Sequence, residues 1–152
     1  MKLIAAVCFA VTVVGVNAAA WAQQPQGGWI ADPKTGCRVW NNYPRPDDRI
    51  TYEGHCVGGF ADGQGVTNWF SKGKNYEKDI GEFKKGKMDG HIKMTDESGT
   101  FDGQFRDQKP NGFGTFKAND GEVFSGQWIE GCFNDGKRRA QYNALDGCNF
   151  SS

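Results

Sequence analysis

The sequence has no net charge, no second long hydrophobic run and only two histidines in 152 residues. With 18 basic and 18 acidic side chains, the chain offers no electrostatic reason to expect nucleic acid or an anionic membrane as a partner. Beyond the N-terminus, no apolar stretch approaches the roughly 17 to 25 residues of a membrane-spanning helix. Glycine, aromatic residues and cysteine therefore carry the information in this chain.

The N-terminus has the features of an export signal. Lys2 precedes an almost wholly apolar run at residues 3–16, and Ala20-Trp21-Ala22 has the small-x-small pattern that a signal peptidase accepts. The sequence predicts a cleaved signal peptide at residues 1–22, with cleavage after Ala20 as the alternative. The mature protein is expected to be periplasmic or secreted and to have no transmembrane segment.

Glycine and aromatic residues are abundant together. The chain has 22 glycines, about twice the ordinary frequency, and also eleven phenylalanines and five tryptophans. Disordered chains are often rich in glycine but poor in aromatic residues. This composition therefore predicts ordered strands and turns.

A short pattern recurs along the chain. Four anchoring glycines are spaced by 27, 22 and 23 residues: Gly54, Gly81, Gly103 and Gly126. Nine residues after each of the first three comes a second glycine, preceded by Asp or Asn: Gly63, Gly90 and Gly112. Internal periods of this size indicate stacked supersecondary units.

Each unit is predicted to be a β-hairpin. Large side chains flank the anchoring glycines at a spacing of two, which fits a half-buried strand. The predicted aromatic core comprises Tyr52, Phe83, Phe101, Phe105, Phe124 and Trp128. Since glycine has no side chain, it leaves room for neighbouring rings to lie over the backbone, and the Asp-Gly and Asn-Gly pairs are expected to mark the turn region.

Two of the units carry a family resemblance. Tyr52-Glu53-Gly54 with Gly59, Gly63 and Gly65 resembles a MORN repeat, as does Phe101-Asp102-Gly103 with Phe105, Gly112 and Gly114. We expect an all-β fold, a single elongated twisted antiparallel sheet of tandem β-hairpins, with little or no helix outside the signal peptide.

Several positions depart from the family pattern. Cys56 stands where the family usually has Trp, Gln108 and Ile92 replace glycines, and a fourth copy has Asp135 at the expected turn glycine. The fourth copy is expected to be degenerate because terminal repeats must cap the array.

The predicted organisation has five parts. After the signal peptide come a flexible segment at 23–35, an N-terminal capping hairpin at 36–51, MORN-like repeats at 52–134 and a C-terminal cap at 135–152.

Four cysteines remain after cleavage, and in an oxidising compartment they allow three disulfide pairings. If residues 36–40 pair antiparallel with residues 50–56 around the proline-containing loop, Cys37 lies opposite Cys56. That bond is favoured, and Cys132 would then pair with Cys148.

The sequence predicts no catalytic residue, metal or cofactor. His55 and Cys56 are neighbours on a strand and point to opposite faces, so they are poorly placed to share a proton. The cysteine spacing does not suit zinc, and Asp62-Gly63-Gln64-Gly65 has too few carboxylates for calcium. A glycosidase-like pair among Glu53, Asp62, Glu82 and Asp102 would have to converge in one concave pocket.

We therefore expect an exported repeat module, not an enzyme, that binds another protein or acts as a scaffold in the cell envelope or secreted space. The alternative is a module that binds a glycan or a lipid headgroup. A glycan would use exposed rings such as Trp29, Trp40 and Trp69, which can equally pack within the hairpins. Acidic lipid could contact residues 84–87, a lysine-rich run that also suits a solvated turn.

Overall fold

The computed structural model describes residues 27–144 and 147–150, so the predicted signal peptide lies outside the described residues. The described residues form eleven β-strands and no helix, so they include no helix long and apolar enough to cross a bilayer. The strands are β1 (Gly28–Ala31), β2 (Arg38–Asn41), β3 (Arg49–Val57), β4 (Phe60–Ser71), β5 (Lys74–Lys84), β6 (Lys87–Thr95), β7 (Gly99–Arg106), β8 (Lys109–Ala118), β9 (Val123–Ile129), β10 (Cys132–Asn134) and β11 (Arg139–Gln141). The predicted all-β class is confirmed.

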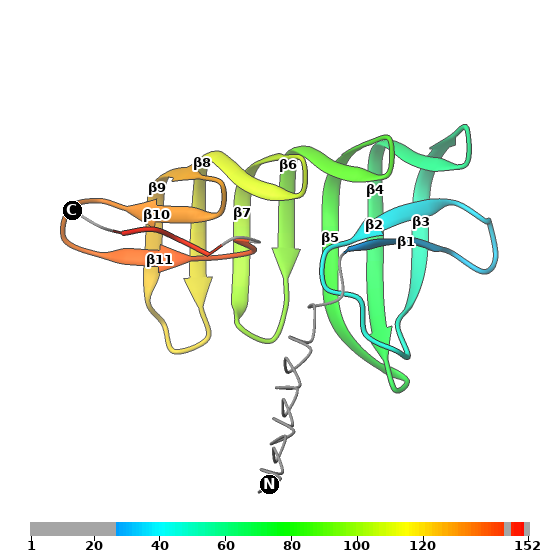
Figure 1. The fold of residues 1–152 in the computed structure, drawn as a ribbon, viewed down its shortest axis with the longest axis horizontal. Coiled ribbons are helices and arrows are strands. Elements are labelled where there is room, and N and C mark those ends of the chain that lie inside the picture. Colours follow the sequence, from blue (N-terminus) through cyan, green and yellow to red (C-terminus); the bar gives the residue numbers. More distant parts are fainter. Residues whose placement is uncertain (1–26, 145–146, 151–152) are drawn as a thin grey trace, which may run out of the picture.

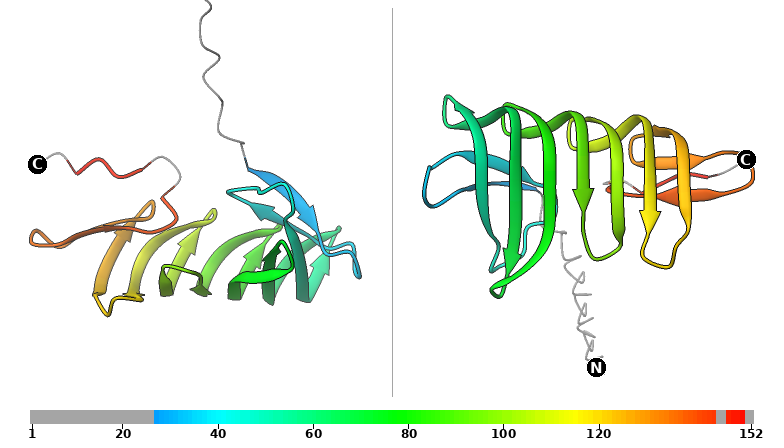
Figure 2. Two further views of the ribbon diagram at one scale, coloured as in Figure 1. Left: turned by 90° about the horizontal axis from the view of Figure 1, so that it is seen from below. Right: turned by 180° about the vertical axis from the view of Figure 1, so that it is seen from behind.

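The strands make one large, curled and mostly antiparallel sheet. Its order is β1-β2-β4-β5-β6-β7-β8-β9-β10-β11, with β3 paired to β4. The β1–β2 and β10–β11 hairpins lie over the same, concave face at opposite ends of the sheet (Figures 1 and 2). The sheet is therefore a half-barrel that is covered at both ends and open in the middle.

The concave face is organised in rows that run across the strands. Residue pairing connects one glycine-rich row from β3 to β9: Gly54, Gly65, Gly81, Ile92, Gly103, Gly114 and Gly126. A second row, two residues earlier on β3, is mostly hydrophobic: Tyr52, Thr67, Asp79, Met94, Phe101, Phe116 and Phe124. Each anchoring glycine thus has a core position beside it on the same face.

In two of the units, an aromatic ring lies directly over the backbone of a glycine. A Cβ added at Gly65 would lie 2.6 Å from the Tyr52 ring, and one added at Gly114 would lie 2.4 Å from the Phe101 ring. The six side chains predicted for the core are all buried, and Phe101 packs edge-on against Phe105 and Trp128. Because a ring buries roughly 150 to 250 Å², these contacts dominate the hydrophobic stabilisation.

The position of the hairpin turns corrects one expectation. Gly63, Gly90 and Gly112 lie within β4, β6 and β8, opposite register shifts, while the turns fall four and five residues earlier. At Gly58-Gly59, Lys85-Gly86 and Asp107-Gln108, two successive residues have positive φ. Two successive residues with positive φ are typical of a type I′ turn, whose twist matches that of the flanking strands. The turns therefore form at these pairs and not at the Asp-Gly and Asn-Gly pairs.

The N-terminal hairpin also differs from the prediction. Strand β2 pairs with β1, as in Ile30 opposite Val39, and not with residues 50–56. Residues 28–31, expected to be flexible, are therefore a strand. Packing explains the difference, because the Trp29 ring contacts Trp40 at 5.0 Å and Phe60 at 4.9 Å between ring centroids. At the other end, the β10–β11 hairpin straddles the expected boundary between residues 134 and 135.

Candidate functional site

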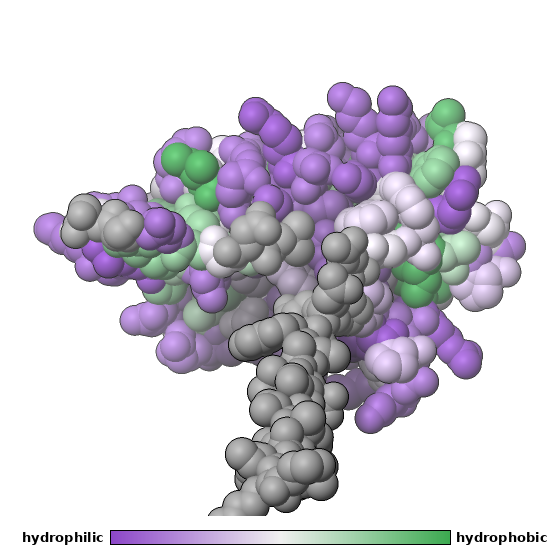
Figure 3. All heavy atoms as spheres, viewed as in Figure 1, coloured by the Kyte–Doolittle hydropathy of each residue, from purple (hydrophilic) through white to green (hydrophobic). Residues whose placement is uncertain are grey.

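A groove of about 420 Å³ opens on the concave face between the two end hairpins. We call it the central groove; its main lining residues are Tyr43, Arg45, Tyr76, Glu77, Met94, Asp96, Tyr142 and Asn143. It narrows into a pocket of about 70 Å³ that shares several of these residues and reaches Trp69 and Gln108. The face that carries the groove is largely hydrophilic, with hydrophobic residues gathered mainly over the β1–β2 end (Figure 3).

Asp79 lies beneath the groove in a position that other units fill with a ring. It follows Glu77 by two on β5, so both side chains face the concave side. Asp79 is 1% exposed, and its Oδ2 accepts hydrogen bonds from Thr67 Oγ1 at 2.6 Å and Trp69 Nε1 at 2.8 Å. Its Oδ1 is buried without a hydrogen-bond partner.

Burial dominates the ionisation of these two carboxyl groups. It raises the pKa of Asp79 to about 6, although the two donated hydrogen bonds act in the opposite direction. Burial also raises the pKa of Glu77 well above its usual value, and the negative charges of Asp79 and Asp96 add to the effect. The groove therefore holds carboxyl groups that titrate much closer to neutrality than exposed ones.

Asp96 and Tyr142 form the wall on the C-terminal side. Asp96 Oδ1 caps the β6–β7 turn by accepting hydrogen bonds from the backbone N–H groups of Ser98 and Gly99, at 2.7 and 3.1 Å. The Tyr142 hydroxyl donates to Asp96 Oδ2 at 3.1 Å, and its ring stacks on Phe116. Burial and Asp96 raise the pKa of Tyr142, so the hydroxyl remains a donor at physiological pH.

The opposite wall comes from the loop that follows β2. Asp48 Oδ1 accepts a hydrogen bond from the Tyr76 hydroxyl at 3.2 Å. The Arg45 guanidinium lies 3.9 Å from the centroid of the Tyr76 ring, in cation–π contact. A cation is thus already held against one ring of the groove.

Gln108 connects the two ends of the molecule. Its side chain donates to the Trp40 carbonyl at 2.9 Å and accepts from the Met88 N–H, while its own carbonyl accepts from Asn143 Nδ2 at 2.7 Å. Gln108 is 4% exposed and has a φ of 74°, a conformation that favours glycine. The departure from glycine noted in the sequence therefore has a structural role, since a glycine could not make the side-chain contacts.

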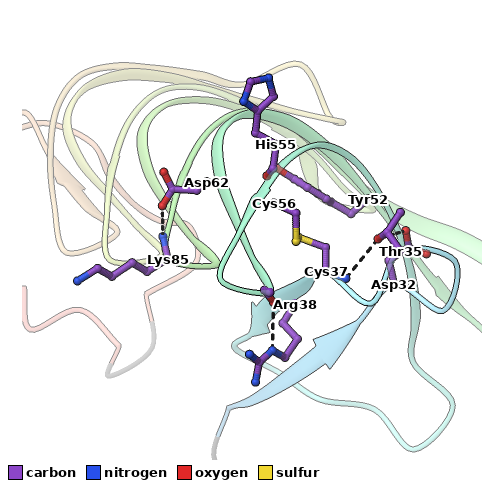
Figure 4. The surroundings of a disulfide bond; sticks show 10 residues. Asp32, Thr35, Cys37, Arg38, Tyr52, His55, Cys56, Asp62 and Lys85 are labelled. Carbon is purple, nitrogen blue, oxygen red and sulfur yellow. Dashed lines mark hydrogen bonds between the residues drawn. A yellow bond between two sulfur atoms is a disulfide. The ribbon is translucent and has the colours of Figure 1, made fainter.

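Both favoured disulfides are present, Cys37–Cys56 and Cys132–Cys148, with Cα–Cα distances of 5.9 and 5.7 Å. In Figure 4 the first bond joins Cys37, the residue before β2, to Cys56 in β3, beside the hydrogen bond from Arg38 Nε to the Gly59 carbonyl at 3.1 Å. Two disulfides indicate an oxidising, extracytoplasmic environment. Since Cys56 is oxidised, it is not available as a nucleophile beside His55.

The carboxylates singled out from the sequence lie outside the central groove. Asp62 and Glu82 line a separate surface depression and accept hydrogen bonds from the Lys85 N–H and the Gln64 amide. Glu53 is exposed, and Asp102 is 2.7 Å from His91 on the surface. Among residues 27–144 and 147–150, no three His, Cys, Asp or Glu side chains are grouped to hold a metal ion.

The groove residues Glu77, Asp79 and Asp96 were missed by sequence reasoning. One signal was present, because Asp79 precedes Gly81 by two, where Tyr52, Phe101 and Phe124 precede their own glycines. A carboxylate at a repeated ring position is a departure that packing does not require.

The three tryptophans considered as a glycan platform have different roles. Trp69 is buried and bonded to Asp79, whereas Trp29 is 45% exposed and packs on Trp40. They do not form one exposed row. In the lysine-rich run, Lys87 Nζ lies 2.5 Å from Asp107 Oδ1, and Lys85 begins the β5–β6 turn.

Comparison with known protein families found no family whose pattern matches the chain, and no curated protein matches it either.

Proposed function

We propose that this protein is an exported, MORN-like binding module, periplasmic or secreted, that holds a protein partner at its central groove. The observation that carries the proposal is the groove itself, a cavity of about 420 Å³ between the two end hairpins. The Cys37–Cys56 disulfide fastens the N-terminal hairpin to β3, and Gln108 contacts residues at both ends. A site on such a fixed frame loses little conformational entropy on binding.

The composition of the groove suits a protein interface. Tyrosine and arginine are enriched at the energetically important positions of interfaces, and the groove presents Tyr43, Arg45 and Tyr76 on one side. In the described part of the chain, β3 pairs on one side only, with β4. Its outer edge offers an additional place for backbone pairing with a partner.

Site-specific photo-crosslinking in cells that make the protein tests this proposal. A photoreactive residue at Tyr43, on the groove rim, should capture a defined partner, to be identified by mass spectrometry. The control is the same residue at Phe113, which is 66% exposed and points away from the concave face. Equal capture at both positions, or no capture at Tyr43, contradicts protein binding at the groove.

Glycan binding is the second candidate, because tyrosine rings and carboxyl groups line the same groove. Rings stack on sugars, and carboxylates accept hydrogen bonds from hydroxyl groups. Envelope oligosaccharides should then change the fluorescence of Trp69, which is bonded to Asp79 beneath the groove. Vesicles containing acidic lipid provide the corresponding test of headgroup binding.

We assign no catalytic role, and a direct assay separates binding from catalysis. Glu77 and Asp96 both line the groove, the arrangement that glycoside hydrolysis would require. Release of nitrophenol from nitrophenyl glycosides by the wild type, lost in Glu77→Gln, would replace the binding proposal with an enzymatic one.

A further inference from the structure

We propose that the central groove recognises an organic cation, namely the ammonium or guanidinium group of a lysine or arginine side chain on the partner. This inference rests on the proposed function and deepens it by naming the chemistry of the contact.

The charges around the groove are unequal. Glu77, Asp96 and Glu97 line it, Asp79 lies beneath it and Asp48 stands behind Tyr76. Facing them are Arg45 and, at the margin, Lys74, whose ammonium is 3.7 Å from Glu97. With these carboxyl groups ionised, the site has an excess of negative charge in a partly desolvated space. An incoming cation would favour that ionised state and lower the raised pKa values of Glu77 and Asp79.

The hydrogen-bonding groups left over are acceptors. Among the described residues, the buried side-chain atoms without a hydrogen-bond partner are Asp79 Oδ1 and Asn42 Oδ1, and Asn42 lines the narrow inner pocket. Asn42 Oδ1 borders the space that a ligand would enter, whereas Asp79 lines neither cavity and acts through its charge. Burying an unpaired acceptor costs free energy, so the inner pocket favours a ligand that supplies an N–H donor. Ammonium and guanidinium groups donate and do not accept, which matches both the charge and the hydrogen-bonding deficit.

The aromatic residues favour the same ligand. The guanidinium of Arg45 already lies 3.9 Å from the centroid of the Tyr76 ring, which shows that a planar cation fits this wall. A cation from outside would gain the same kind of attraction from the ring faces of the groove. It would also compete with Arg45 for Tyr76 and for the charge of Glu77.

The shape favours a single side chain over a polymer. The groove narrows from about 420 Å³ to about 70 Å³, and the inner pocket is bordered by Asn42, Gln108 and Asn143. These residues are joined by hydrogen bonds, including 2.7 Å from Asn143 Nδ2 to the Gln108 carbonyl. One charged head on an alkyl stem fills such a tapering space.

The test is a titration of the full mature chain followed by NMR. Capped tripeptides Gly-Lys-Gly and Gly-Arg-Gly should shift the signals of Tyr43, Asn143 and Tyr142. The norleucine peptide, which keeps the alkyl stem and lacks the charge, should bind at least about tenfold more weakly. Spermidine is titrated in parallel to separate a free polyamine from a protein side chain.

Two variants with opposite expected effects make the test specific. Glu77→Gln should weaken binding of the lysine peptide about tenfold, whereas Arg45→Gln should strengthen it several-fold by removing the resident cation. A purely structural role for these residues would not produce a gain. The control is Glu82→Gln, which removes the same charge from the outward side of the same strand and should leave affinity unchanged.

Each other outcome rejects part of the inference. Equal binding of the norleucine peptide overturns recognition of charge, and binding of spermidine without the peptides overturns a protein source. If no cation binds while Tyr43 still crosslinks to a partner, the cation inference fails and the proposed function stands. If the crosslinks are absent as well, both fail.

Discussion

At the scale of single residues, Asp79 is the least expected feature of the chain. Its register partners on the neighbouring strands are Thr67 and Met94, and the other units place aromatic rings in this row. A buried carboxylate with one unpaired oxygen lowers stability whenever it is ionised. Such a cost at a position that hydrophobic packing could fill points to a role in binding.

The pH dependence of stability tests the ionisation of Asp79. Because burial raises its pKa from 3.8 to about 6, the folded state takes up a proton more readily than the unfolded state. The contribution to the free energy of unfolding is therefore greatest below about pH 4 and falls by up to about 3 kcal/mol as the pH rises past 6. Glu77 acts in the same direction.

Urea unfolding between pH 4 and 8 measures this effect. Asp79→Asn should flatten the decline and be more stable than the wild type at pH 8. Glu82→Gln, on the exposed side of β5, should keep the wild-type slope. Parallel curves for Asp79→Asn and the wild type would show that Asp79 is not the titrating group.

Phe105 tests the aromatic core at a single position. It is 3% exposed, and its ring centroid lies 5.3 Å from that of Phe101. Phe105→Ala should lower the free energy of unfolding by about 3 kcal/mol or more, since it removes a buried ring and leaves a cavity. A loss under about 1 kcal/mol in a thermal melt would reject this packing, and Phe113→Ala, at an exposed ring, is the matched control.

At the scale of elements, the glycine-rich row allows the Tyr52 and Phe101 rings to cover their own hairpins. Gly114→Ala should destabilise the protein by about 2 kcal/mol, because the new Cβ would lie 2.4 Å from the Phe101 ring and force it to move. Gly28→Ala is the control, since nothing lies within 4 Å of its Cβ position. Equal melting temperatures for the two variants would contradict the nesting of rings over glycines.

The hairpins and the core rings could be predicted because their signals are local or repeated. The Cys37–Cys56 bond is present, although the pairing of residues 36–40 with residues 50–56 from which it was predicted is not. The period of two beside Gly103 and the recurrence of the pattern specify both the strands and the buried face. The β1–β2 pairing could not be derived in this way, because it depends on Trp29 packing against Phe60. The groove could not be predicted from the sequence either, because its walls are joined by contacts such as that of Gln108 with Trp40, which are 68 residues apart.

At the scale of the whole molecule, Gln108 joins the two end hairpins across the concave face. Gln108→Gly should keep the sheet but remove the hydrogen bond to the Trp40 carbonyl. Amide hydrogen exchange should then become faster in β2, whereas the region around Asn143, which bonds to the backbone carbonyl of residue 108, should be little changed. Unaltered exchange in β2 would show that the β1–β2 hairpin is held independently of the Gln108 side chain.

Because the strands follow one another across the sheet, the number of hairpins sets the distance between the two walls of the groove. The walls of the groove stand on opposite ends of one sheet, and neighbouring strands are about 4.8 Å apart, so each hairpin inserted between them would move the walls apart by about 10 Å. A longer array with the same ends would accommodate a wider ligand and lose the Gln108 bridge. In a lineage of such proteins, duplication or loss of one hairpin would therefore alter ligand size in discrete steps, without any change in the residues that make contact.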